Sequence, residues 1–202
     1  MPRDPRPDVL FEPIEIGCKT LPNRFYQVPH CSGFGVVKPW TQARHRSSKA
    51  EGGWGAVCTE YCSISPEADE SPSVAARMWD EPDSEHLRLM TDEARRPRAL
   101  AAIELLHSGV HAHDAESRLP PAGPSQTAGG FSNIVPRTLS IADIRRIQSD
   151  WVLAAERSRD AGVASRLLAD AIFDGHRLGR EVDGPHPQTA LPYLREGPAS
   201  LA

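Results

Sequence analysis

The stretch that decides the fold class is WGAVCTEY, at residues 54–61. It is mostly apolar, and it lacks the alternation of polar and apolar residues that a half-exposed strand shows. Residues 98–106, RALAAIELL, repeat this pattern and are nearly all aliphatic apart from Glu104. Strands buried on both faces occur in parallel sheets covered by helices, so the sequence predicts an α/β fold.

Strand and helix segments alternate along the first 162 residues. A short hairpin is expected at 10–17, because this segment alternates and then reaches a glycine. Three strand–helix units follow, at 23–30 with 41–52, at 54–61 with 85–95, and at 98–106 with 140–162. The third helix begins at a capping box formed by Ser140 and Asp143. After Gly162 the pattern changes, since 163–182 is predicted to be another helix and is followed by a proline-rich tail.

Helical spacing assigns side chains to faces in two of these helices. In the first helix, the side chains expected to be exposed are Gln42, Arg44, His45 and Lys49. In the third helix, the apolar residues that recur at helical spacing are Ile141, Ile144, Ile147, Val152 and Ala155.

Composition excludes several classes of function. The chain has 202 residues and a formal net charge of −4, so no broad attraction to nucleic acid or to a membrane surface is expected. No apolar run approaches the roughly 20 residues of a membrane span. The four cysteines, at positions 18, 31, 58 and 62, lack the spacing of a disulfide framework. This favours a reduced, cytoplasmic protein.

His30 and Cys31 end the first predicted strand, at the edge where β/α proteins keep their chemistry. The thiolate is the nucleophilic form of cysteine, and a neighbouring imidazole favours it. The alternative is a structural cysteine in the core, because free cysteines are commonly buried. The residues alone leave both interpretations open.

A metal site is the weaker interpretation of the histidine-rich loop. His107, His111 and His113 lie within seven residues, but no cysteine is spaced to complete a ligand set. Cys58 and Cys62 lie too far apart along a strand to hold one metal ion. We therefore expect no metal ion.

Seven stretches of the chain are similar to one known family. They are LFEPI at 10–14, NRFYQVPHC at 23–31, KAEGGW at 49–54, TEYCSI at 59–64, MTDE at 90–93, GPSQ at 123–126 and RSRDAG at 157–162. Through them, residues 4–162 resemble the N-terminal flavin barrel of trimethylamine and dimethylamine dehydrogenases, in the old yellow enzyme superfamily. The resemblance implies a partial (β/α)8 TIM barrel of about three β/α units.

The same resemblance implies a flavin site at the end of the first strand. Cys31 matches the cysteine that is bonded covalently to C6 of FMN, and His30 lies beside it. Val28 and Pro29 would supply backbone and packing near the flavin ring.

Three further residues take roles from the resemblance. Tyr61 matches an aromatic side chain of the substrate bowl, where rings hold an alkylammonium by cation–π attraction. Glu60 and Glu104 lie at strand ends where the family contacts the pyrimidine edge of the flavin. The alternatives are a Tyr61 that merely caps its strand and a Glu104 that is simply solvated.

The resemblance also covers the end of the chain. Residues 163–202 contain LADAIFDGHR at 168–177 and LPYLRE at 191–196, which are similar to the end of the family's dinucleotide-binding domain. The chain thus resembles a member with its middle absent, including barrel strands four to eight, the phosphate site and the cysteines of the iron–sulfur cluster. We therefore do not expect that cluster here.

Two functions follow as hypotheses. The first is an FMN-dependent oxidoreductase that oxidises a methylated amine, a small-molecule substrate. The second is a non-catalytic remnant that no longer holds FMN. An open sheet edge rich in apolar residues also predicts aggregation or a homo-oligomer.

Overall fold

The computed structural model describes residues 6–68, 76–112, 117–126 and 134–163. Its centre is a parallel sheet built on β4 (Ala56–Ser63). One side of β4 pairs along its length with β6 (Leu100–Leu106). The other side pairs with β3 (Tyr26–Gln27) at the start of β4 and with β5 (Ala76–Arg77) at its end. Every pairing in this sheet is parallel, which confirms the predicted parallel α/β arrangement, and β5 is an additional short strand that was not predicted.

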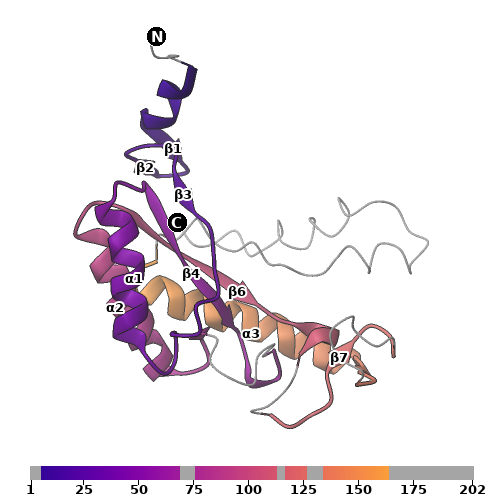
Figure 1. Ribbon diagram of the computed structural model, residues 1–202. Helices are drawn as coiled ribbons and strands as arrows, with labels where there is room; N and C mark the ends of the chain where they lie inside the picture. The colour runs from indigo at the N-terminus through magenta and orange to yellow at the C-terminus, as the bar shows by residue number, and fades with distance from the viewer. Residues whose placement is uncertain (1–5, 69–75, 113–116, 127–133, 164–202) are drawn as a thin grey trace. The chain divides into compact units, whose positions relative to one another are not determined.

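Three helices accompany the sheet, as Figure 1 shows: α1 (Pro39–Glu51), α2 (Glu81–Arg95) and α3 (Ile141–Asp160). Helix α1 packs against α2 and β4, and α2 packs against β6 and α3. Helix α2 starts earlier than predicted, because the side chain of Asp80 accepts a hydrogen bond from the amide of Asp83 and Pro82 fits the first turn. The capping box of Ser140 and Asp143 at the start of α3 is confirmed.

The hydrophobic core lies between the sheet and these helices. Val57, Ile103 and Leu105 from the strands join Leu87 and Met90 from α2 in one buried cluster. Because side chains alternate along a strand, Ala102 and Glu104 lie on the opposite face of β6. That second face carries part of the candidate site.

Residues before the sheet form a short separate hairpin, as predicted. Strand β1 (Ile14–Ile16) pairs antiparallel with β2 (Lys19–Leu21), and Gly17 takes the positive φ of 60° that the turn requires. A 3₁₀ helix, η1 (Arg6–Phe11), precedes it and includes Leu10 and Phe11, which were expected to lie in the hairpin.

The segments after β4 and β6 contain short elements. They are η2 (Pro66–Ala68), η3 (Gly109–His111), β7 (Ala122–Gly123) and β8 (Arg137–Thr138). The last two pair with each other in parallel. No helix among the described residues is both long and apolar enough to cross a membrane.

The first strand is much shorter than predicted. The side chain of Asn23 accepts a hydrogen bond from the amide of Phe25 at 3.1 Å and donates one to the carbonyl of Gly53 at 2.7 Å. This turn delays the sheet pairing until Tyr26, and Pro29 has no amide with which to extend it.

Some predicted helix faces were wrong. Gln42 is buried, because it lies on the inner face of α1 with Ala43 and Arg46. In α3, Ile147 is buried, whereas Ile141 and Val152 are exposed. The helix predicted at 163–182, and all but the first residue of the region 163–202, lie outside the described residues.

Candidate functional site

The loop after β3 carries the exposed Cys31, and the carboxylate of Glu60 holds the residues that follow it. Glu60 lies in β4 and is fully buried. Its Oε2 accepts hydrogen bonds from the amide of Ser32 at 2.5 Å, the hydroxyl of Ser32 at 2.9 Å and the amide of Gly33 at 2.8 Å. Its Oε1 accepts from the amide of Gly35 at 2.6 Å. Glu60 therefore fixes this loop, and the flavin contact that the resemblance implied for it stays a prediction.

The guanidinium of Arg46 holds the residues that precede Cys31. Arg46 lies in α1 and is 1% exposed. It donates hydrogen bonds to Oε1 of Gln27 at 3.1 Å and to the carbonyl oxygen of His30. Burial lowers the pKa of Arg46, whereas the negative charge of Glu60 raises it, and Arg46 also interacts electrostatically with Cys31.

A buried thiol lies between this loop and β6. Cys58 is fully buried, and burial raises its pKa to about 11, so it is a thiol at neutral pH. Its side chain is hydrogen-bonded to Tyr26, and it interacts electrostatically with Glu104 and Arg46. Cys58 thus connects the surroundings of Cys31 with those of Glu104.

Tyr61 and Glu104 form the second part of the site. They are register partners on β4 and β6, and the register shifts between Cys58 and Tyr61 because β4 has one extra residue there. Partners in a sheet project to the same face, and here this is the face opposite the helices. Glu104 is 8% exposed, so the alternative of a simply solvated carboxylate is wrong.

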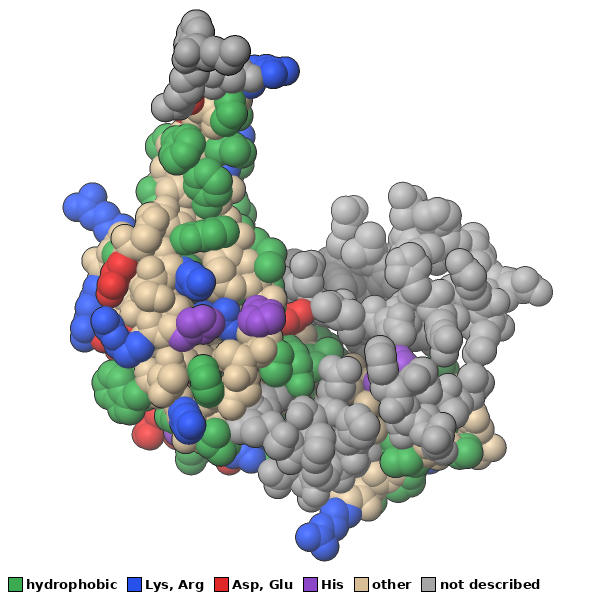
Figure 2. Space-filling view, in the orientation of Figure 1, with side chains coloured by type: hydrophobic (Ala, Val, Ile, Leu, Met, Phe, Trp, Pro, Cys, Tyr) green, Lys and Arg blue, Asp and Glu red, His purple; other side chains and the backbone are tan. Residues whose placement is uncertain are grey.

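The remaining predicted residues lie on the loop itself. Val28, His30 and Cys31 are exposed, and Pro29 is half-buried. The exposed thiol rules out the alternative of a core cysteine at position 31. Burial, followed by the charge of Arg46, lowers the pKa of His45, which also interacts electrostatically with His30. Histidine and basic side chains gather on the face shown in Figure 2.

In the described part of the histidine-rich loop, His107 has a structural role. His107 is buried, and its Nδ1 accepts a hydrogen bond from the amide of Gly109 at 3.1 Å. Burial lowers the pKa of His107. His113 lies outside the described residues, and no group of three potential metal-binding side chains occurs among those described.

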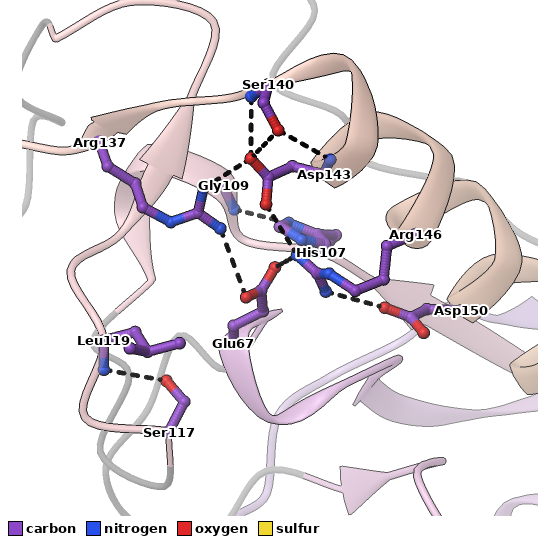
Figure 3. Close-up of polar contacts among 10 residues, drawn as sticks. All are labelled: Glu67, His107, Gly109, Ser117, Leu119, Arg137, Ser140, Asp143, Arg146 and Asp150. Carbon is purple, nitrogen blue, oxygen red and sulfur yellow. Dashed lines mark hydrogen bonds and ion pairs between the residues drawn. The ribbon is translucent and has the colours of Figure 1, made fainter.

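An ion-pair network lies beside His107, as Figure 3 shows. Glu67 of η2 pairs with Arg146 of α3 and, at 3.6 Å, with Arg137 of β8. Arg137 also contacts Asp143 at 2.9 Å, and Arg146 contacts Asp150 at 3.3 Å. All five charges have partners, so the network fastens the end of β4 to α3 and does not present a free binding group.

A small cavity beside β4 is a packing gap. It measures about 10 Å³ and is lined by Gly35, Thr59, Cys62 and Met90, among others. This is room for roughly one water molecule, so it is no ligand site.

The sequence reasoning missed two residues of the site, Arg46 and Cys58. Arg46 follows Ala43 by three residues and precedes Ala50 by four, so all three share one face of α1. That spacing was the signal for a buried arginine. Cys58 was considered only as a metal ligand.

Residues 9–165 match the model of the NADH:flavin oxidoreductase / NADH oxidase family. The chain belongs to this family. It is 46% identical over 169 residues to dimethylamine dehydrogenase from Hyphomicrobium sp. (strain x), a match that covers 80% of this chain. This relative belongs to the group that the sequence resemblance indicated.

Two solved structures are similar. Histamine dehydrogenase from Rhizobium sp. 4-9 shares 36% identity at a TM-score of 0.73, over 77% of this chain. An amine oxidase for 6-hydroxypseudooxynicotine from Pseudomonas geniculata N1 shares 35% at a TM-score of 0.75, over 80% of this chain. The chain spans only about a quarter of these relatives, 23% of the dimethylamine dehydrogenase and 23% and 24% of the two structures.

Proposed function

We propose that this chain forms the first three strand–helix units of a flavin barrel and holds FMN through Cys31. In this proposal it acts as an FMN-dependent oxidoreductase on a methylated amine. FMN would supply the ability to accept two electrons from the substrate. The observation that carries the proposal is the exposed thiol of Cys31, on a loop that the buried Glu60 fixes.

The residues present are compatible with a flavin. Cys31 would bind the ring, with Val28, Pro29 and His30 beside it. Glu104 is a buried acceptor on the open face of the sheet, suited to the N–H groups of a pyrimidine edge. Glu60 contacts the loop after β3, which carries Cys31.

Tyr61 would contribute to substrate binding. Its ring projects to the same face as Glu104, since the two residues are register partners. An aromatic face attracts a quaternary or protonated amine, and this attraction strengthens as water is removed. Tyr61 would therefore hold the substrate near the group bound at Cys31.

A second candidate function is a non-catalytic remnant that no longer holds FMN. The supporting observation is that the chain spans only 23% of the length of the dimethylamine dehydrogenase that it matches. The parts of the family that bind the FMN phosphate and the iron–sulfur cluster have no counterpart in the sequence. We accordingly expect no iron–sulfur cluster.

The two candidates differ in their visible spectra. The chain is purified with FMN present, and the spectrum is recorded before and after precipitation in acid. Colour that stays with the protein supports a covalent flavin, and its loss in Cys31→Ala assigns the attachment. A colourless wild-type product supports the remnant. Cys18→Ala is the matched control, because Cys18 is exposed in the same way.

A further inference from the structure

The peptide groups on both sides of Cys31 are held by two buried side chains of opposite charge. On the preceding side, Arg46 donates a hydrogen bond to the carbonyl oxygen of His30. On the following side, Glu60 accepts from the amide of Ser32 at 2.5 Å. The backbone around the thiol is thus fixed at both ends, although the thiol itself is exposed.

Burying these two charges is costly unless each is compensated. Arg46 is 1% and Glu60 0% exposed, and they interact with each other electrostatically. Both form hydrogen bonds to the loop, Arg46 to the carbonyl oxygen of His30 and Glu60 to Ser32, Gly33 and Gly35. Two buried charges are therefore hydrogen-bonded to the same short segment of backbone, on either side of Cys31.

The fit between the loop and Glu60 is close. A Cβ atom placed on Gly35 would lie 2.7 Å from Oε1 of Glu60 and 2.5 Å from the Cβ of Ala76. A side chain at position 35 would require Ala76 or Glu60 to shift, so the loop packs closely over β4 and β5.

We propose that Arg46 and Glu60 are positioning residues for Cys31, which together fix the loop and keep the thiol reactive. Glu60 sets the place of the backbone, and the positive charge of Arg46, which interacts electrostatically with Cys31, favours the nucleophilic thiolate. The proposal rests on the proposed function only for the identity of the group that Cys31 receives. Reactivity and loop order are properties of the chain without flavin.

The charge effect is measured by alkylation of the flavin-free chain with iodoacetamide, followed by peptide mass spectrometry. Cys18 is the internal reference, so the quantity is the ratio of the Cys31 rate to the Cys18 rate. We expect Arg46→Gln to lower this ratio about tenfold, and Arg46→Lys, which retains the charge, to stay within about threefold of wild type. An unchanged ratio in Arg46→Gln overturns the role of Arg46.

The loop effect is measured by hydrogen exchange of the amides of Ser32, Gly33 and Gly35. We expect Glu60→Gln to speed their exchange at least about tenfold, because one amide oxygen replaces a charged acceptor. Glu104→Gln is the matched control, a buried carboxylate on the neighbouring strand, and it should leave this exchange unchanged. Equal protection in Glu60→Gln and wild type overturns the role of Glu60.

Arg46→Gln leaves the buried charge of Glu60 without compensation and can prevent folding. The double variant Arg46→Gln/Glu60→Gln removes both charges, and circular dichroism establishes which variants fold. The double variant should show both the lower alkylation ratio and the faster exchange, and a wild-type result for both overturns the proposal.

Flavin attachment separates this proposal from the proposed function. If the wild type takes up no FMN while alkylation and exchange change as expected, the positioning role stands and the flavin assignment fails. If covalent FMN forms equally well in the wild type and the double variant, the positioning role is overturned and the flavin assignment stands.

Discussion

Tyr61 and Glu104 lie directly opposite each other on neighbouring parallel strands, β4 and β6, just beyond a bulge in β4. Cys58 pairs with Ala102, so Thr59 and Glu60 together occupy the place opposite Ile103. The extra residue brings Tyr61 to the face of Glu104, away from the helices. Without the bulge, the alternation of β4 would direct Tyr61 into the core beneath α1 and α2.

Substitution of Gly35 tests the close packing of the Cys31 loop. We expect Gly35→Ala to lower the free energy of unfolding by about 1–3 kcal/mol, because the added methyl group would overlap Ala76 and the carboxylate of Glu60. Val37→Ala is the control in the same loop, at a side chain that is 62% exposed. Chemical denaturation of both variants is the measurement. A free energy of unfolding for Gly35→Ala equal to that of the wild type would show that the loop is not closely packed at Gly35.

Glu67 is expected to stabilise the attachment of α3. Glu67→Gln removes the charge that Arg137 and Arg146 share, and we expect a loss of about 1 kcal/mol, since the two arginines are partly exposed. This corresponds to a decrease in Tm of about 2–4 °C, measurable by calorimetry. Arg145→Gln, at the exposed neighbour of Arg146 on the same helix, should leave Tm unchanged. A Tm for Glu67→Gln equal to that of wild type would contradict a stabilising role for the network.

The free energy of unfolding should decrease as the pH decreases below 6.5, because of His107. Burial lowers its pKa below the ordinary value of 6.5, so the unfolded chain binds the proton at a higher pH than the folded chain does. The free energy of unfolding is then unaffected by His107 above pH 6.5. It decreases below pH 6.5, by at most about 1.4 kcal/mol per pH unit for this group, until the folded form is also protonated.

Urea denaturation between pH 7 and pH 5 measures this slope. His107→Asn retains an acceptor for the amide of Gly109 and removes the titration. We expect a shallower slope in this variant. The slope that remains includes His45, whose pKa burial also lowers. A slope as steep as that of the wild type would show that His107 titrates equally in both states.

The open edge of β6 should cause association. Among the described residues β6 pairs only with β4, and its residues are mostly apolar. We expect light scattering after size exclusion to give a mass above that of the monomer, increasing with protein concentration. Association should persist in Ile144→Lys/Val152→Lys, which alters exposed apolar residues of α3 but not the strand. A monomer at all concentrations would contradict this expectation.

Local sequence patterns correctly predicted those strands and helix ends that depend on residues close together in the chain. The apolar runs of β4 and β6 and the capping box of Ser140 and Asp143 are set by residues close in the chain. The sequence placed Cys31 at the end of the first predicted strand, whereas the structure places it, exposed, on the loop that follows β3.

Features that depend on distant partners could not be predicted in the same way. The bulge before Tyr61 exists only in the pairing with β6, and the role of Glu60 depends on a loop 25 or more residues earlier. Gln42 was expected to be exposed because of its polarity, although the face it shares with Ala43 and Arg46 is covered. The spacing of Ala43 and Ala50 marks this face of α1, but packing decides which polar side chains beside them become buried.

The most direct test of the account is the mass of the tryptic peptide that contains Cys31, after expression with FMN. We predict a peptide heavier by one FMN less two hydrogens. The thioether bond replaces one hydrogen of the thiol and one of the ring, and dioxygen takes up the electron pair. The peptide containing Cys18 should be unmodified. An unmodified Cys31 peptide from folded protein supplied with FMN would contradict the central claim.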